Sequence, residues 1–152
     1  MRSVALIAVI VTFSVSALPV CAFSAENKSP DPETIAALEA RANQAQPREQ
    51  CFLYAQLIQQ MTELSIHQYA AGNFDKATNL LKRVQGITQK LHVTLANNDK
   101  RLKDAEILLS HSAFRLNEML HATSIQDRPL VQDTLAQVSQ AQNDTMMQVF
   151  RK

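Results

Sequence analysis

The chain of 152 residues contains only two glycines, Gly72 and Gly86, and no tryptophan. Glycine supplies the positive φ angles of tight hairpin turns. A chain with so few glycines is therefore unlike a β-rich protein, which has many such turns. The sequence is instead rich in Ala, Leu, Gln, Lys and Glu, which are good helix formers. The composition therefore predicts an all-α protein.

Charge of one sign is also lacking. Lys and Arg number 15 and Asp and Glu number 14, which gives a formal net charge of +1. No basic excess is present to follow a nucleic-acid backbone, and no acidic or basic block forms an electrostatic tail. The charge balance therefore predicts no nucleic-acid partner.

The N-terminal segment has the layout of a secretory signal peptide. Arg2 precedes an apolar run from Val4 to Val15, and Pro19 and small residues follow up to Ala22. This order predicts cleavage after Ala22, with residues 1–22 as the signal peptide. The run is shorter than the roughly 20 residues of a membrane helix. We therefore expect an exported protein, periplasmic or secreted, with no membrane span after cleavage.

The chain has two cysteines, Cys21 and Cys51. Cys21 allows a lipoprotein alternative, but "LPVC" has Pro and Val where small residues should precede a lipidated cysteine. Cleavage after Ala22 leaves Cys51 alone, so no disulfide can form within the chain. Cys51 lies on an apolar helix stripe, which predicts a buried side chain, and pairing with a second chain is the alternative.

Prolines divide the remaining chain into a segment over residues 23–46 and a helical domain over residues 47–152. Asp31 and Pro32 predict an N-cap and first turn in the first segment, which is otherwise a polar linker. Apolar residues at helical spacing predict one core-facing stripe on each longer helix. The predicted fold is an antiparallel up-and-down bundle of about four long helices plus a short N-terminal helix. Their expected ranges are 32–45, 47–71, 74–95, 102–120 and 129–150.

Residues 97–99, Asn-Asn-Asp, leave one boundary open. These residues are poor helix formers and good caps, which predicts a loop. A seven-residue apolar spacing nevertheless continues through them, from Ala77 by way of Leu91 to Ala105. Such a constant phase is typical of an uninterrupted helix. The second and third long helices are therefore either separate or fused.

The stretch "NEMLH" sets Glu118 and His121 three residues apart, the Glu-x-x-His spacing of metal-binding bundles. A di-iron bundle needs two such pairs and two further glutamates, all pointing inward. At about 100° per residue, Glu118 points away from the apolar stripe of its helix. Glu63 and His67 also lie away from the stripe of theirs. We therefore predict solvated polar faces and no metal site.

Methionine and histidine raise a haem- or copper-binding alternative. Met61, Met119, Met146 and Met147 accompany four histidines, yet no Met–His pair on facing stripes is evident. Met61 is expected to fill the core. No motif places a nucleophile, a base and an acid together. The sequence thus predicts no cofactor and no catalytic residue.

Ile107 and Phe114 form a candidate contact surface. They are seven residues apart and lie more than about 90° from the core stripe of their helix. A helix that is apolar on two sides usually has two neighbours. The cover is either the short helix that begins at Pro32, through Ile35 and Leu38, or a second subunit.

The stretch "QYAAGNFDKATNLL" resembles the turn of a tetratricopeptide repeat. Gly72, Phe74, Ala77 and Leu81 match that pattern within one hairpin over residues 61–84. A shift of 34 residues puts Glu106 where a second glycine belongs, and an array needs at least about three repeats. The resemblance therefore implies one helical hairpin rather than a repeat array.

A second resemblance covers more of the chain. "REQCFLYAQLIQQMTEL" and "KRLKDAEILLSHSAFRLNEML" resemble a group of uncharacterised exported bacterial helical proteins. This resemblance implies a bacterial envelope location and brings no activity. The function expected is that of a non-enzymatic scaffold or partner-binding module, with a protein partner or a homodimer. The alternative is a metal- or haem-binding bundle with Met and His ligands.

Overall fold

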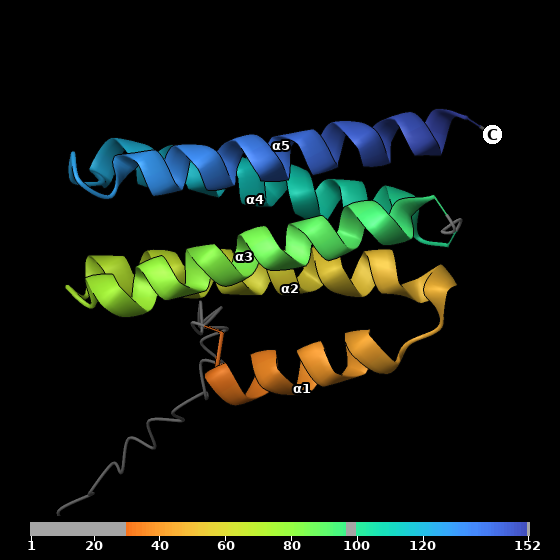
Figure 1. Cartoon of the computed structure of the whole chain (residues 1–152), viewed down its shortest axis with the longest axis horizontal. Coiled ribbons are helices and arrows are strands. Elements are labelled where there is room, and N and C mark those ends of the chain that lie inside the picture. The colour runs from red at the N-terminus through yellow and green to blue at the C-terminus, as the bar shows by residue number, and fades with distance from the viewer. Residues whose placement is uncertain (1–29, 97–99, 152) are drawn as a thin grey trace, which may run out of the picture.

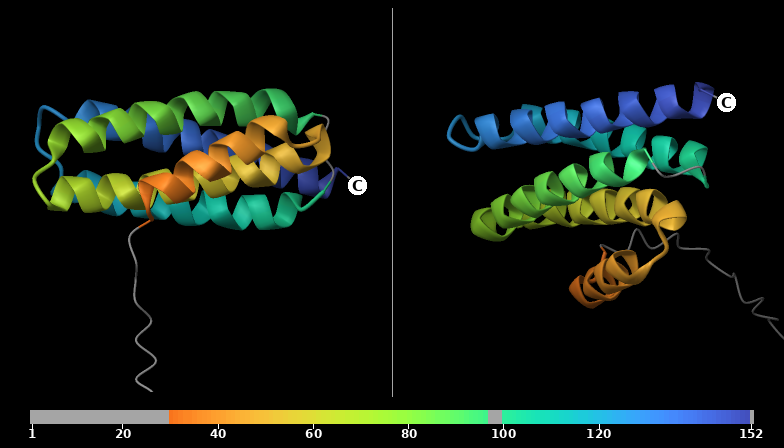
Figure 2. Two further views of the ribbon diagram at one scale, coloured as in Figure 1. Left: turned by 90° about the horizontal axis from the view of Figure 1, so that it is seen from below. Right: turned by 45° about the vertical axis from the view of Figure 1, so that its right-hand side comes forward.

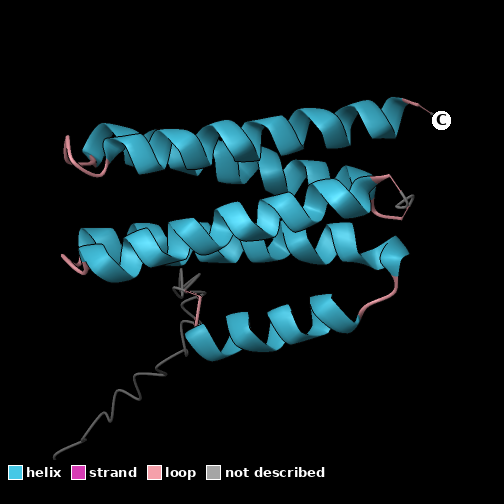
Figure 3. Cartoon of the chain, in the orientation of Figure 1, coloured by secondary structure: helices cyan, strands magenta, loops and turns pink. Residues whose placement is uncertain are grey.

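The computed structural model describes residues 30–96 and 100–151, and within these ranges it contains helices and no strand (Figure 1, Figure 3). The predicted all-α class is confirmed. The predicted signal peptide and residues 97–99 themselves lie outside the described residues. The helices are α1 (Pro32–Gln44), α2 (Pro47–Ala70), α3 (Phe74–Leu95), α4 (Leu102–Ala122) and α5 (Arg128–Phe150).

Prolines and one glycine define the helix ends. Pro32 and Pro47 are the first residues of α1 and α2, where the missing backbone N–H leaves no helical hydrogen bond unmade. Gly72 joins α2 to α3 at a φ of 80°, which an L side chain adopts only with strain. Its backbone N–H donates to the carbonyl of Tyr69 and closes the end of α2. This turn falls between the helix ranges 47–71 and 74–95 that the sequence predicts.

The helices pack as two hairpin layers. The contacting pairs are α2–α3 and α4–α5 within the layers, and α2–α4 and α3–α5 between them. α1 lies against α2 on the side away from the α4–α5 layer (Figure 2). The described part of the chain therefore forms a stack of α1, then α2 with α3, then α4 with α5.

The two hairpins stack in the same orientation. Gln59 contacts His111, and Glu63 contacts Arg115, with the same separation of 52 residues. A constant separation marks parallel neighbours, and Figure 1 shows α2 and α4 running the same way, as α3 and α5 do. In the described ranges, the consecutive helices α3 and α4 are not neighbours. This order differs from a simple up-and-down ring, in which each helix packs against the next.

α4 returns in the opposite direction to α3 (Figure 1). A single fused helix would keep one direction over both ranges. The fused alternative is therefore wrong, and the continuous seven-residue spacing is a property of two separate core-facing stripes.

The core extends through the stack and takes residues from all five helices. Cys51 and Met61 are fully buried, as predicted for both. Burial raises the pKa of the Cys51 thiol to about 12, so it remains protonated and is a core residue. A disulfide to a second chain through this buried sulfur is excluded in the folded state. Other large, fully buried side chains are Leu57, Ile58, Leu81, Leu91, Leu109, Leu116, Val131 and Val138.

α1 is held to the first layer by apolar burial and one ion pair. Ile35 and Ala42 are buried, and Ile35 borders a groove that Leu64 and Leu80 also line. Arg83 of α3 donates to the carboxylate of Glu39 at 2.6 Å. α1 therefore covers one face of the α2–α3 hairpin. No helix of the described ranges is long and apolar enough to cross a membrane.

Candidate functional site

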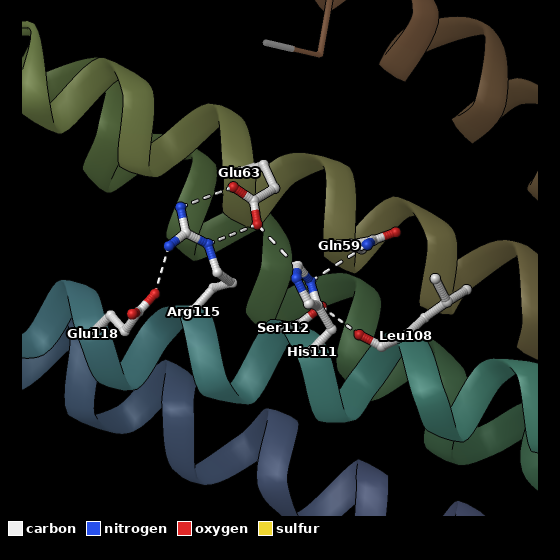
Figure 4. Close-up of polar contacts among 7 residues, drawn as sticks. All are labelled: Gln59, Glu63, Leu108, His111, Ser112, Arg115 and Glu118. Atoms are coloured by element: carbon white, nitrogen blue, oxygen red, sulfur yellow. Dashed lines mark hydrogen bonds and ion pairs between the residues drawn. The ribbon is translucent and has the colours of Figure 1, made fainter. Parts of the chain in front are cut away.

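A charged cluster joins the two layers where α2 meets α4 (Figure 4). Arg115 donates to both carboxylate oxygens of Glu63, from Nε at 2.9 Å and from a terminal nitrogen at 3.2 Å. Its other terminal nitrogen donates to Glu118 at 2.5 Å. The hydrogen bond to Glu63, and then that to Glu118, raise the pKa of Arg115. The guanidinium is therefore a permanently charged link between the layers.

One turn earlier, the same junction carries a second contact between the two helices. Gln59 Nε2 lies 3.4 Å from Nδ1 of His111, and that nitrogen lies 3.9 Å from a Glu63 oxygen. These side chains border an open groove of about 420 Å³. Within the described residues, Gln60 Oε1 is buried without a hydrogen-bond partner. The groove is lined by Pro30, Gln59, Gln60, Glu63, His67, His111 and Arg115.

The cluster corrects one sequence prediction. Glu63 was expected on a solvated face, but its side chain is only 21% exposed and is paired with Arg115. The reason is that α2 contacts three other helices, so little of its surface stays free. His67 is exposed, as expected. The sequence does carry one signal for this cluster. Gln59 and Glu63 are four residues apart, as are His111 and Arg115, so the two pairs can face each other across parallel helices.

The two NEMLH residues Glu118 and His121 have different neighbours. Glu118 and His121 are both exposed, as predicted. Glu118 is bound to Arg115, whereas His121 borders a separate groove near Tyr69. Across residues 30–96 and 100–151, no group of three or more His, Cys, Asp or Glu side chains is arranged to hold a metal ion.

The methionines are likewise dispersed. Met61 and Met119 lie in the core, and Met146 and Met147 are exposed near the end of α5. The four side chains thus differ in exposure, two being buried in the core and two lying at the surface of α5.

Tyr69 ties the α4–α5 turn to the end of α2. Its hydroxyl donates to Asp127 at 3.1 Å and accepts from the backbone N–H of Ser124 at 2.9 Å. Its ring packs edge-on against Phe74 with centroids 4.8 Å apart. Both hydrogen-bonding functions of the phenol are used, so Tyr69 positions the turn. The groove beside it measures about 550 Å³ and is otherwise lined by Ile66, Ala70, Met119, His121, Ala122 and Thr123.

Ile107 and Phe114 are both exposed, about two turns apart on one side of α4. Their side chains are 55% and 60% exposed and lie opposite the buried stripe of that helix. α1 does not cover them, because it packs on the other side of the stack (Figure 2). The predicted cover through Ile35 and Leu38 is therefore wrong. The helix that α1 does cover is α2. Buried residues of α2 lie on more than one side of that helix, and α1 packs against one of those sides.

α5 also carries exposed apolar side chains. Phe150 is 79% exposed and Met146 is 39% exposed. Both border a groove of about 250 Å³ that Lys103 and Glu106 of α4 also line. We call the set Ile107, Phe114, Met146 and Phe150 the outer face. The α4 half of this set could be predicted from the helical pattern of the sequence, whereas the α5 half could not, because the pattern does not show that α5 packs beside α4.

Clustered apolar side chains in water mark interaction sites, whereas single exposed ones are common on any surface. Comparison of the chain with protein-family models, with curated proteins and with solved structures finds no match. The resemblance to exported bacterial helical proteins therefore stays an expectation.

Proposed function

We propose that the protein is a non-enzymatic, exported binding module of the bacterial envelope. In this proposal, α2 to α5 form one four-helix unit of two antiparallel hairpins, and its outer face docks a protein partner. The observation that carries the proposal is the 60% exposure of Phe114 on the uncovered side of the α4–α5 layer. Covering a phenylalanine is worth roughly 1.5–3 kcal/mol.

The two ends of the stack differ, and this difference supports a docking role. Stacked helical hairpins require covered or polar end faces to stay soluble. At one end, α1 buries Ile35 and Ala42 against the first layer. At the other end, no described helix covers Ile107 and Phe114. We infer that a partner takes the place at this end that α1 takes at the other.

The pairing of the charged cluster supports a structural role for it rather than a catalytic one. Both oxygens of Glu63 accept from Arg115, and Arg115 also binds Glu118. A general acid or base must be able to exchange a proton with a substrate. These three groups instead satisfy one another across the layers. The cluster thus fixes how the α4–α5 layer, and with it the outer face, is presented.

Export rests on the order of charge, apolar run and small residues in residues 1–22. We expect the mature chain to begin at Phe23. The mass of the protein recovered outside the cytoplasm tests this. A mass that includes Met1, or a lipid attached to Cys21, would contradict it.

Site-specific photo-crosslinking in living bacteria tests the docking role. A benzophenone amino acid replaces Phe114 in one variant and Val93 in the control, since Val93 is 79% exposed on α3. We expect a discrete covalent adduct from position 114 and none from position 93. Equal labelling at both positions, or none at position 114, contradicts the proposed function.

A further inference from the structure

We propose that the occupant of the outer face is a second copy of this chain. In this arrangement α4 packs antiparallel against α4 of the second copy, around a two-fold axis that passes between Ser110 and His111. The inference rests on the proposed role of the outer face as a docking surface and names its partner.

The spacing of the apolar residues fits such a pairing. In a symmetric antiparallel helix pair, two residues face each other when their numbers add to a constant value. Ile107 and Phe114 lie seven residues, or about two turns, apart and share one side of α4. Ile107 then faces Phe114 of the second copy, and Phe114 faces Ile107 of the second copy. All four exposed side chains become covered by two equivalent contacts.

Charge complementarity selects the same register. Lys103 precedes Ile107 by four residues, and Glu118 follows Phe114 by four residues. The pairing of Ile107 with Phe114 therefore also places Lys103 opposite Glu118 of the second copy, and does so twice. Glu118 is 46% exposed, so its carboxylate can face Lys103 while one of its oxygens accepts from Arg115 of its own chain. A parallel pairing would instead place Lys103 beside Lys103, and like charges across an interface are unfavourable. The charges thus favour the antiparallel register.

The centre of the contact allows the helices to approach closely. Ser110 lies at the axis and is among the smallest side chains of α4. On the other side of the axis, the His111 ring nitrogen Nδ1 is engaged with Gln59 of α2. Ser110 is small, and the His111 ring is held by Gln59 of its own chain. Neither side chain therefore blocks the contacts between Ile107 and Phe114 on either side of the axis.

The size of the face also suffices. α4 has 21 residues, which gives a length of about 30 Å, and two neighbouring helices present a width of about 20 Å. The layer thus offers roughly 600 Å² from each copy. Specific protein interfaces bury about 1,200–2,000 Å² in total. A face-to-face contact of the α4–α5 layers reaches the lower end of this range.

The capped end explains why the assembly would close as a dimer. A head-to-tail stack would place the outer face of one copy on the α2–α3 layer of the next. α1 already occupies that layer and buries Ile35 there. The outer face therefore meets only another outer face. Such an isologous contact closes after two chains and does not grow into a filament.

Charge reversal tests the register. Light scattering on the protein purified after export should show two chains at concentrations of about 10–100 μM, a range suited to a small interface. Lys103→Glu and Glu118→Lys should each raise the dimer Kd about tenfold. The combined variant should restore dimerisation, because it exchanges the two charges at both contacts. A monomeric parent protein, or a double variant no better than the singles, overturns the proposal.

Cysteine cross-linking provides a second readout that does not depend on the Arg115–Glu118 contact. Ser110→Cys should form a disulfide-linked dimer on mild oxidation, because the two copies of this residue meet at the axis. Val93→Cys, exposed on α3, is the control and should not. Both variants also carry Cys21→Ser, so that the buried Cys51 is the only natural thiol. Equal cross-linking at both positions overturns the proposal.

The two proposals fail in different ways. If the protein is monomeric and the benzophenone at position 114 captures a different protein, the second copy is the wrong partner and the docking role stands. If position 114 captures nothing and the protein is monomeric, both proposals are wrong. A dimer whose adducts at position 114 contain only this chain supports both.

Discussion

Glu63 of α2 and Arg115 of α4 form a two-pronged ion pair across the junction of the hairpin layers, at 2.9 and 3.2 Å. The side chains are 21% and 30% exposed, so water screens them only in part. Their fixed geometry, repeated one turn earlier by Gln59 and His111, sets the parallel register of α2 and α4. The ion pair therefore links the buried core to the placement of the outer face.

Arg115→Met should lower the free energy of unfolding by about 1–2 kcal/mol, because Glu63 is then left half-buried without its partner. Urea unfolding followed by circular dichroism measures this loss. Adding Glu63→Gln should recover part of it, since the unpaired charge is removed. Arg83→Ala is the matched control. Arg83 is 48% exposed, and its ion pair in the described part of the chain is with Glu39, so its loss should stay below about 1 kcal/mol.

His121→Ala should change the free energy of unfolding by less than about 0.5 kcal/mol, because this side chain is exposed and away from the charged cluster. Leu109→Ala, in the fully buried stripe of the same helix, should cost about 2–5 kcal/mol. Calorimetric melting of both variants checks the contrast. Metal analysis should give the same content before and after the histidine is removed. A metal lost with His121 would mean that NEMLH is a binding site.

Helix ends could be predicted from the sequence because their signals are local. Pro32 and Pro47 begin α1 and α2, and Gly72 marks the turn after α2, each through its own backbone chemistry. The neighbours of each helix could not be predicted in the same way. The apolar pattern around Ile35 is compatible with packing on α2 or on α4. The packed structure shows that Ile35 lies against α2. Glu63 was predicted to be solvated for the same reason, because the sequence does not show that α4 packs beside it.

Cys51 should resist thiol reagents in the folded protein. Its side chain is fully buried and its pKa is raised to about 12 by that burial, so below that pH the reactive thiolate is scarce. In a Cys21→Ser variant, whose only cysteine is Cys51, labelling should follow the rate of unfolding and become complete in denaturant. Rapid labelling without denaturant would show that the α2 stripe opens locally.

The two glycines provide a matched pair for the last prediction. Gly72 has a φ of 80°, whereas Gly86 lies on an exposed helical position of α3, and an added Cβ would meet no atom within 4 Å at either residue. Any effect of alanine is therefore conformational rather than steric. Gly72→Ala should lower the free energy of unfolding by about 1–2 kcal/mol, because the left-handed backbone is strained for an L side chain. Gly86→Ala should raise it by about 0.5–1 kcal/mol, because alanine loses less backbone freedom than glycine on entering a helix. Urea unfolding of the two variants should move in opposite directions. If both shift the same way, the turn after α2 does not hold its positive φ in solution.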